Sequence, residues 1–457
     1  MSDLRSALAA VVGERNVQTG AEAGEDYAHD EALTATHQLP AFVVKPGSTE
    51  DVAAIVTLAR ENGAPITARG SGTGLSGSCI PREDGILISF ERMNQILEID
   101  TQNHVAVVQP GVTLDELDKA TAQHGFVYPV YPGENSASLG GNVATNAGGL
   151  RAVKYGVTRH QVLALTAVLG TGEVIRTGGR FVKATAGYDL TQLIIGSEGT
   201  LALATEATLK LYPRPEFATT LLAPFPTLDA ITAIVPSIIA SGVAPLIVEY
   251  IDMIAMAGIL NNAGLDLGIP QEIKDKALAY LVVVLEDRRA DRLDENVEEL
   301  ATLVGERGAL DVYVLPPQAG ASLIHARERA FWASKSAGAH DIIDMVVPRA
   351  AIPEYMAKVN ELAQASGSFL TGCGHVGDGN VHLSVFQAEE GKRKELIRSI
   401  FEAGMELGGA ISGEHGIGTE KKPYYLTLEQ PVKLDLMRRI KTAFDPDGIL
   451  NPGKIFD

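Results

Sequence analysis

The chain has 457 residues and a formal net charge of −19, with 57 acidic residues against 38 Lys and Arg. A chain of this length exceeds one ordinary hydrophobic core, so two or three domains are expected. The acidic balance without a polybasic tract argues against a nucleic-acid-binding protein. With only two cysteines, Cys79 and Cys373, a disulfide framework or an iron–sulfur cluster held by this chain alone is also disfavoured.

The N-terminal segment M-S-D-L-R-S-A-L-A-A has no long apolar run and does not read as a signal peptide. No segment approaches the roughly 20 apolar residues that span a bilayer. We therefore expect a cytoplasmic protein, and peripheral contact with a membrane stays open as an alternative.

The first 215 residues are predicted to contain short strands, helices and glycine-rich loops. A helix is predicted directly after Ser48, which has N-cap spacing to Asp51. Apolar residues recur at helical period over 52–59, and Gly63 marks the end of this helix. Further elements of this half are a helix over 113–125 and strands over 64–67, 85–89, 105–108, 164–169 and 201–209.

The pattern changes after Pro213-Arg214-Pro215, where longer helices begin to alternate with strands. Such a pattern predicts an α+β domain. Its clearest elements are strands over 246–250, 280–285 and 312–315 and helices over 291–305, 392–407 and 431–444.

The segment Arg69–Gly77 contains Gly72, Gly74 and Gly77 at the G-x-G-x-x-G spacing of a Rossmann dinucleotide site. A Rossmann site needs a helix immediately after the loop. Pro81 prevents a helix of useful length there, because proline removes a helical hydrogen bond and clashes with the preceding turn. The loop is better explained as an anion nest, in which exposed backbone N–H groups surround phosphates.

A second loop, over 131–149, holds almost nothing larger than Asn after Ser136, apart from Leu139 and Val143. Small residues let the backbone approach a flat ligand closely, so we favour ligand contact over a mobile surface loop. A third, shorter loop over 195–200 would by itself indicate only a turn.

Two histidines bracket a turn in the segment H-V-G-D-G-N-V-H, which runs from His375 to His382. The Asp-Gly pair at 378–379 predicts a two-residue hairpin turn, which would place the two histidines directly opposite each other. Opposed residues have Cβ atoms about 4.5–5.5 Å apart, so both imidazoles could reach one metal ion. Glu414 is a candidate third ligand and His415 a candidate base. The alternative is a hairpin with two unconnected histidines.

Six motifs occur in a fixed order along nearly the whole chain from residue 38. They are R-G-S-G-T-G-L-S-G, P-G-x-x-x-A-S-L-G-G-N-V-A-T-N-A-G-G, G-Y-D-L-T-x-L-x-I-G-S-E-G-T-L, G-H-x-G-D-G-N-x-H, G-E-H-G-I-G and D-P-x-G-I-L-N-P-G-K. In this order they resemble the FAD-linked D-2-hydroxy acid dehydrogenases. That family includes D-lactate dehydrogenase, D-2-hydroxyglutarate dehydrogenase and the D subunit of glycolate oxidase, all flavoproteins of the vanillyl-alcohol oxidase type.

The resemblance implies an α+β fold in three parts. Residues 1–215 would form the FAD-binding domain with two α+β subdomains. Residues 216–425 would form a substrate (cap) domain that has an antiparallel sheet and holds the metal site. Residues 426–457 would be a C-terminal segment that returns to the FAD domain.

The resemblance also assigns residues to the cofactor, and FAD would be bound noncovalently because the first loop lacks the histidine that tethers FAD in some of these flavoproteins. The loop at the FAD pyrophosphate comprises Arg69, Gly70, Ser71, Gly72, Thr73 and Gly74. The segment along the FAD contributes Pro132, Gly133, Ser138, Gly141, Asn142, Thr145 and Gly148, and later contacts come from Glu198, Gly199 and Asn451.

By the same resemblance, His375, His382 and Glu414 would hold a divalent metal, zinc or manganese, and His415 would be the general base. The implied reaction oxidises a 2-hydroxy acid to the 2-oxo acid, with the hydride passing to FAD and the hydroxyl proton to His415. Arg327 matches the arginine that would bind the substrate carboxylate. Arg329, Lys335 and Arg349 are its alternatives.

Two departures from the family pattern bear on the substrate. Where hydroxyglutarate-type sequences carry a Thr and a Lys, an ungapped alignment on Arg327 places Phe331 and Ile342. A small or apolar monocarboxylate, such as D-lactate or glycolate, is therefore favoured over 2-hydroxyglutarate.

Other functions remain open from the sequence. They are a metallohydrolase that uses only the His-His-Glu site, a flavin-free binding subunit, and a flavin oxidase that reacts with oxygen directly. The electron acceptor is undetermined among a quinone, an electron-transfer flavoprotein and a cytochrome, and a homodimer is a further expectation.

Overall fold

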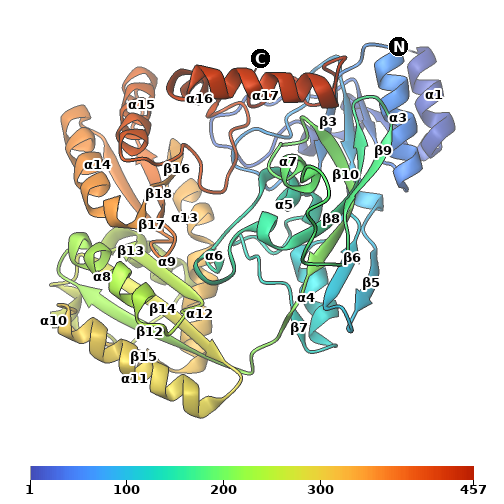
Figure 1. The fold of residues 1–457 in the computed structure, drawn as a ribbon. Coiled ribbons are helices and arrows are strands. Elements are labelled where there is room, and N and C mark those ends of the chain that lie inside the picture. Colours follow the sequence, from blue (N-terminus) through green and yellow to red (C-terminus); the bar gives the residue numbers. More distant parts are fainter. Residues whose placement is uncertain (1, 457) are drawn as a thin grey trace.

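Residues 2–456, which the computed structural model describes, form two sheet-based bodies side by side (Figure 1). The strands of the N-terminal half make a four-stranded, a five-stranded and a two-stranded sheet, whereas the strands beyond residue 216 make one seven-stranded sheet. The predicted α+β class is confirmed. None of the described helices is long and apolar enough to cross a membrane.

The first small sheet has the strand order β1-β2-β4-β3. Strands β2 and β3 run parallel to β4, and β1 is antiparallel to β2. The predicted N-cap of α3 is present, because the Ser48 hydroxyl accepts a hydrogen bond from the Asp51 N–H at 3.1 Å. Its elements are α1 (Ser2–Val12), β1 (Val17–Thr19), α2 (Gly20–Ala23), β2 (Phe42–Val44), α3 (Thr49–Glu61), β3 (Ile66–Arg69) and β4 (Ile86–Ser89).

The second small sheet is antiparallel, with the order β5-β6-β10-β8-β9. Thr113 and Glu116 form a complete capping box at the start of α4. This part comprises β5 (Ile96–Asp100), β6 (Val105–Val108), α4 (Leu114–Ala122), β7 (Phe126–Val127), α5 (Leu139–Thr145), α6 (Ala152–Tyr155), β8 (Val162–Leu169), β9 (Val174–Gly178), α7 (Leu190–Ile194), β10 (Ala202–Lys210) and β11 (Tyr212–Pro213), of which β7 and β11 pair separately.

The large sheet is antiparallel throughout and has the order β15-β12-β14-β13-β17-β18-β16. Its strands are β12 (Phe217–Phe225), β13 (Ile247–Asp252), β14 (Ala279–Asp287), β15 (Tyr313–Leu315), β16 (Asp341–Val346), β17 (Phe369–Gly374) and β18 (Asn380–Phe386). Its helices are α8 (Leu228–Ala240), α9 (Met253–Ala263), α10 (Gln271–Lys274), α11 (Ala290–Glu306), α12 (Pro317–Glu328), α13 (Ala330–Ser336), α14 (Ile352–Ser366) and α15 (Glu390–Glu406).

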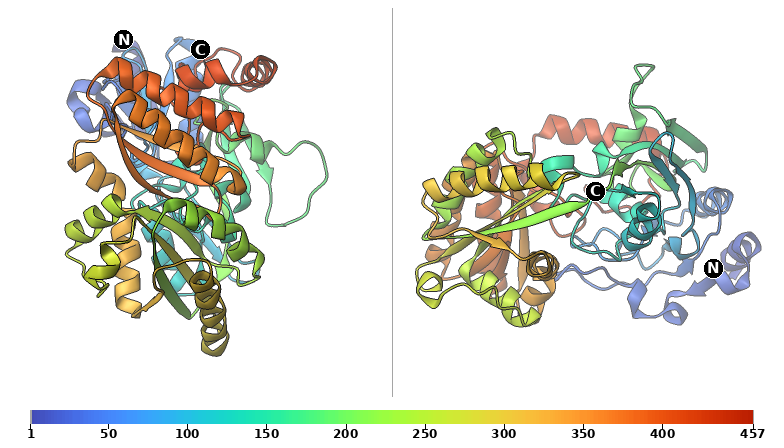
Figure 2. Two further views of the ribbon diagram at one scale, coloured as in Figure 1. Left: turned by 90° about the vertical axis from the view of Figure 1, so that its left-hand side faces the viewer. Right: turned by 90° about the horizontal axis from the view of Figure 1, so that it is seen from below.

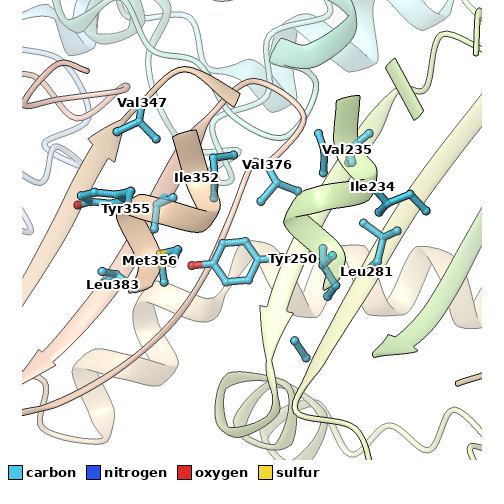
Figure 3. Close-up of a cluster of buried hydrophobic side chains, with 14 of the residues drawn as sticks. Ile234, Val235, Tyr250, Leu281, Val347, Ile352, Tyr355, Met356, Val376 and Leu383 are labelled. Atoms are coloured by element: carbon cyan, nitrogen blue, oxygen red, sulfur yellow. The ribbon is translucent and has the colours of Figure 1, made fainter. Parts of the chain in front are cut away.

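One face of the large sheet packs under α8, α11, α14 and α15 and forms the main core. Figure 3 shows Tyr250 in this core, between residues of α14 such as Met356 and residues of α8 such as Ile234. Neighbouring side chains on a strand point to opposite faces. The residues that alternate with core positions Tyr250, Val381 and Ile343 therefore lie on the opposite face, which is the face that carries the candidate site.

The C-terminal segment crosses back over the N-terminal half through α16 (Lys422–Leu428) and α17 (Pro431–Phe444) (Figures 1 and 2). The Lys441 ammonium donates to the carbonyl oxygens of Thr200 and Leu450, each at 2.7 Å. Leu450 also forms a β-bridge with Ile66. The C-terminal segment therefore returns to the N-terminal half, as predicted.

Asp341, on edge strand β16, provides a stability prediction with a defined pH dependence. Burial raises the pKa of Asp341 to about 6. A carboxyl whose pKa is raised by folding makes the folded state less stable as pH rises through about 4 to 6. We expect Asp341→Asn, which keeps an oxygen for the Ile342 N–H, to stabilise the protein by about 1–2 kcal/mol at pH 7.5 and by almost nothing at pH 4. Urea unfolding at both pH values checks this, and an equal gain at both would contradict it.

Candidate active site

The first glycine loop leaves the end of β3 and packs against the second loop. The Ser71 N–H donates to the Ser138 hydroxyl at 3.3 Å, and the Ser71 hydroxyl donates to the Ser136 carbonyl at 2.6 Å. A Cβ at Gly70 would lie 2.0 Å from the Ser138 Oγ, so a larger residue cannot be placed there. Gly72 has a φ of +75°, which L-residues rarely adopt. The predicted absence of a helix directly after the loop is confirmed.

These two loops and the 197–199 turn line one cavity, and its residues fit a flavin dinucleotide. Two buried polar atoms on its wall, Asn142 Nδ2 and Ser197 Oγ, have no hydrogen-bond partner within the described chain, as expected where a polar ligand binds. The glycines expose backbone N–H groups suited to phosphates. Of the residues assigned to the cofactor by resemblance, those that line the cavity are Gly70, Ser71, Gly72, Thr73, Gly74, Pro132, Ser138, Gly141, Asn142, Thr145, Gly148, Glu198 and Gly199.

Three of the residues assigned to the cofactor do not line this cavity. Gly133 lines the neighbouring cavity. Arg69 donates from Nη1 to the His29 carbonyl at 2.5 Å, behind the loop. Asn451 donates from Nδ2 to the carbonyl oxygens of Ser78 and Glu198, at 2.9 and 2.7 Å, and so ties the C-terminal segment to two cavity-lining segments.

Glu198 connects the cofactor cavity to the loop that follows Glu414-His415. Its carboxylate accepts hydrogen bonds from the backbone N–H groups of Ile417 and Gly418 at 2.7 and 2.8 Å. Glu198 itself has a φ of 52°, a conformation that costs free energy in a non-glycine residue. This strained glutamate fixes the position of the G-E-H-G-I-G loop against the FAD-binding part.

The histidine hairpin differs from the predicted one. His382 pairs with Cys373, not with His375, and the predicted two-residue turn at 378–379 is wrong. The N–H groups of Asp378, Gly379 and Asn380 all point to the His375 carbonyl, at 3.0, 3.1 and 3.3 Å, and close a longer loop over 375–379. The two imidazoles still meet, because this loop folds His375 back: the ring centroids are 4.9 Å apart.

His375, His382 and Glu414 converge as a three-ligand set. Glu414 Oε1 lies 3.2 Å from His375 Nε2 and 3.1 Å from His382 Nε2. Their ligand atoms all lie within 4.8 Å of one another. Two imidazole nitrogens and one carboxylate oxygen suit zinc or manganese and leave room for substrate, so the donor set fits a divalent cation.

Glu249, in the middle of β13, orients this set from behind. Its side chain is fully buried, and its carboxylate contacts His375 Nδ1 and accepts a hydrogen bond from Arg327 Nε at 2.9 Å. Burial would raise the pKa of Glu249, but the charges of Arg327 and His375 outweigh it and lower the pKa. Holding Nδ1 leaves the Nε2 of His375 directed at Glu414, as in metal sites where a carboxylate fixes the histidine tautomer.

Asp344, on β16, holds the loop that presents Glu414 and His415. The N–H groups of Gly413, Glu414 and His415 donate to its carboxylate at 3.1, 3.1 and 3.0 Å, and Lys421 Nζ lies 3.2 Å away. Asp344 also lies near His382 and His415 as a possible second ligand set. Its two oxygens already accept from these donors, the Ser412 hydroxyl and the Asn380 amide, which leaves little capacity for a metal.

Sequence reasoning missed both buried carboxylates. Glu249 lies in the apolar run L-I-V-E-Y-I and Asp344 in I-I-D-M-V-V. An acidic residue inside a predicted buried strand rarely persists without a charged or hydrogen-bonding partner, and this signal could have identified both.

His415 lies where two cavities meet. It lines the cofactor cavity and also a second cavity bounded by Arg327, His375 and His382, and Glu414 does the same. Its ring stacks on that of His382 at 5.2 Å. Burial lowers the pKa of His415 to about 4, so that the imidazole is neutral near pH 7.

Arg327, the residue predicted to bind the substrate carboxylate, also lines the second cavity and is 7% exposed. Phe331 and Ile342, the positions that depart from the hydroxyglutarate pattern, line the same cavity. Of the alternatives to Arg327, Lys335 is engaged with Glu31 at 2.6 Å, and Arg329 and Arg349 are not among the lining residues.

Comparisons with known proteins agree with this arrangement. A family model described as FAD binding domain matches residues 40–178, and one described as FAD linked oxidases, C-terminal domain, matches residues 214–455. The chain is 57% identical to an uncharacterized FAD-linked oxidoreductase of Mycobacterium tuberculosis, over 100% of this chain and 99% of the relative. It is 40% identical to a D-lactate dehydrogenase of Archaeoglobus fulgidus, over 90% of each.

The fold also matches solved flavoprotein structures. The 4-ethylphenol oxidase of Gulosibacter chungangensis superposes with a TM-score of 0.80 at 20% identity, covering 100% of this chain and 97% of that chain. At this identity the likeness shows the fold alone, which is the vanillyl-alcohol oxidase type. The chain is thus an oxidoreductase that belongs to the FAD-linked oxidases, the family of its D-lactate dehydrogenase and glycolate oxidase relatives.

Proposed function

We propose that the protein oxidises a D-2-hydroxy acid of the D-lactate or glycolate type to the 2-oxo acid. The observation that carries this proposal is that Glu414 and His415 line both the cofactor cavity and the cavity that Arg327 faces. A substrate in the second cavity can therefore contact the base while its C2 faces the first. D-2-hydroxyglutarate is the alternative substrate, and the apolar side chains of Phe331 and Ile342 disfavour its second carboxylate.

The chain supplies binding and proton transfer. FAD, held by the two glycine loops and Glu198-Gly199, supplies a hydride acceptor when bound. A zinc or manganese ion, held by His375, His382 and Glu414, supplies Lewis acidity when bound. His415 accepts the hydroxyl proton, since its lowered pKa keeps the imidazole unprotonated at neutral pH.

Arg327 is proposed to bind the substrate carboxylate. A guanidinium has five N–H donors; the Nε of Arg327 donates to Glu249 Oε2 at 2.9 Å, and Nη2 lies 2.7 Å from the same oxygen. The remaining donors are available for a carboxylate in the cavity, and Glu249 keeps the guanidinium fixed. Glu249 thereby sets the positions of both Arg327, proposed to bind the substrate carboxylate, and His375, proposed as a metal ligand.

The proposal retains the three-part division at 1–215, 216–425 and 426–457, with substrate chemistry at the junction of the parts.

Reoxidation of the flavin requires an electron acceptor, for which a quinone, an electron-transfer flavoprotein and a cytochrome are the candidates. The match to an FAD-binding domain favours this function over a metallohydrolase.

Turnover with an artificial dye tests the proposal. Purified protein with FAD and metal should convert D-lactate or glycolate to the 2-oxo acid with dye reduction, at a higher kcat/KM than D-2-hydroxyglutarate. A higher kcat/KM for D-2-hydroxyglutarate would overturn the substrate assignment, and the absence of 2-oxo acid with every 2-hydroxy acid would overturn the oxidoreduction. Product with hydrogen peroxide in place of dye reduction would show a flavin oxidase.

Metal removal gives a second prediction. Treatment with a chelator is expected to abolish flavin reduction, and zinc or manganese should restore it. His382→Ala should lower the bound metal, measured by elemental analysis, whereas His124→Ala, at an exposed position, should not. Unchanged flavin reduction by protein that elemental analysis shows to be metal-free would contradict the role of the metal in the reaction. Wild-type metal content in His382→Ala would contradict the assigned ligand role.

The flavin should be noncovalent. The loop over 69–77 has no histidine for a covalent link, and the wall residues that meet the cavity offer hydrogen bonds and backbone N–H groups. Acid precipitation is therefore expected to release the yellow colour into the supernatant. Colour retained in a washed protein pellet would show a covalent bond.

A further inference from the structure

We propose that the physiological substrate is a 2-hydroxy acid with a long aliphatic or aromatic group on C2, which binds over the far end of the large sheet. This inference rests on the proposed function and names the substrate class more closely. Its binding region, called here the tail subsite, is formed by Phe369, Phe386, Ile342, Ile254 and the facing sides of α9 and α13.

The strand register places the tail subsite on the same sheet face as the candidate ligands. Cys373 pairs with His382, and Phe369 pairs with Phe386 four residues further along both strands. The face of β18 therefore runs from His382 through Ser384 to Phe386, a distance of about 13 Å. One end of this face is the ligand set, and the other end is a pair of phenyl rings whose centroids are 5.5 Å apart.

The second cavity is larger than lactate or glycolate alone would fill. Its volume is about 640 Å³, and the same cavity reaches from His415 to Phe369. Lactate has six non-hydrogen atoms, which even at the liquid volume of one water each occupy only about 180 Å³. Most of the cavity would then hold water, part of it against the apolar side chains of Ile254, Ile342, Phe369 and Phe386, which is unfavourable.

Small residues on two helices leave part of the tail subsite open, although Phe331 of α13 and Asn262 of α9 also line the cavity. On α13 and its C-cap, Ala330, Ala333 and Ala337 line the cavity at helical spacing, and on α9 Ala255 and Gly258 do so. A Cβ at Gly258 would meet nothing within 4 Å, so the space in front of this glycine is empty.

The charges on the cavity wall are confined to the end near the cofactor. Glu328 lies 3.4 Å from the Tyr131 hydroxyl of the second glycine loop, and Arg327 contacts Glu249 beside His375. The sheet face beyond His382 offers Thr371, Ser384 and Ile342 before the two phenylalanines. Because these groups are neutral, the tail subsite favours an apolar chain over a second carboxylate.

A chain-length series tests the inference with the FAD-loaded protein. We expect kcat/KM for D-2-hydroxyoctanoate to exceed that for D-lactate by about 100-fold or more, since each buried methylene contributes several-fold. D-2-Hydroxyglutarate should be a poorer substrate than D-2-hydroxyoctanoate. In calorimetry, 2-oxooctanoate should bind correspondingly more tightly than pyruvate.

A variant that fills the tail subsite tests whether the chain-length preference arises there. Gly258→Phe should reduce the preference for D-2-hydroxyoctanoate over D-lactate at least about tenfold, by occupying the tail subsite, while kcat/KM for D-lactate stays within about threefold. Gly305→Phe is the matched control. It also lies on a helix with nothing within 4 Å of its Cβ, but on α11 outside the cavity, and it should leave the preference unchanged.

The outcomes separate this inference from the proposed function. Equal kcat/KM for D-lactate and D-2-hydroxyoctanoate, or a preference that Gly258→Phe leaves intact, would overturn the tail subsite and leave the function standing. If no 2-hydroxy acid reduces the flavin, the proposed function is wrong, and the affinities for the two oxo acids become the test of the tail subsite. Equal affinities for pyruvate and 2-oxooctanoate would overturn it, and tighter binding of 2-oxooctanoate that Gly258→Phe abolishes would support it.

Discussion

Replacing His415 by alanine is expected to slow flavin reduction by about 10²–10⁴-fold. The imidazole lies where the cofactor and substrate cavities meet, and burial keeps it neutral and able to accept the hydroxyl proton. His415 is not one of the three proposed metal ligands, and its loop position is held by its backbone N–H on Asp344. FAD and metal content should therefore stay at wild-type levels.

The measurement is anaerobic single-turnover reduction followed by flavin absorbance. His415→Gln, which keeps a hydrogen-bonding side chain without a comparable base, should be as slow as His415→Ala. His124→Ala, which removes an exposed histidine, should behave as the wild type. Reduction by His415→Ala at the wild-type rate would remove His415 from the proton-transfer step.

Replacing Asp344 by asparagine is expected to destabilise the folded protein by about 3–5 kcal/mol and to abolish flavin reduction. The fully buried carboxylate accepts from three consecutive backbone N–H groups of the loop and pairs with Lys421, which is itself buried. An asparagine would turn an NH₂ group toward these donors and leave the Lys421 ammonium without its counter-charge.

Asp341→Asn is the matched control, because it makes the same substitution on the same strand. Asp341→Asn should stabilise the protein at pH 7.5, because burial raises the pKa of Asp341. At Asp344 the effect of burial is outweighed by Lys421 and the neighbouring histidines, which lower the pKa of Asp344 well below its usual range. Urea unfolding of the two variants measures the difference. A stability within about 1 kcal/mol of wild type for Asp344→Asn, with intact flavin reduction, would show that the loop does not depend on this carboxylate.

Elements with local signals could be predicted from the sequence. Helices α3 and α4 start at the Ser48 and Thr113 caps, and α17 spans the predicted 431–444. Helix α8 was not predicted, since Pro236 lies inside it and its burial on the sheet outweighs the lost hydrogen bond. Local capping interactions determine where a helix begins, whereas tertiary packing determines whether a helix with an internal proline, such as α8, forms.

In the candidate site, too, local features could be predicted from the sequence and contacts between distant residues could not. The spacing of His375 and His382 indicated a shared ligand set, but the register was wrong because three N–H groups converge on the His375 carbonyl. The preference of Asp-Gly for a two-residue turn is outweighed by these bonds, each of which contributes about 0.5–1.5 kcal/mol. Glu249 lies 126 residues from His375 in sequence, so no local pattern joins them.

Anaerobic flavin reduction by a D-2-hydroxy acid labelled with deuterium at C2 tests the central claim most directly. The account predicts that the unlabelled D-acid bleaches the flavin in one turnover with formation of one equivalent of the 2-oxo acid. It also predicts that the C2-deuterated acid does so markedly more slowly, and that the L-acid does not. A flavin that stays oxidised with every D-2-hydroxy acid in metal-loaded protein, from D-lactate to D-2-hydroxyoctanoate, would contradict it.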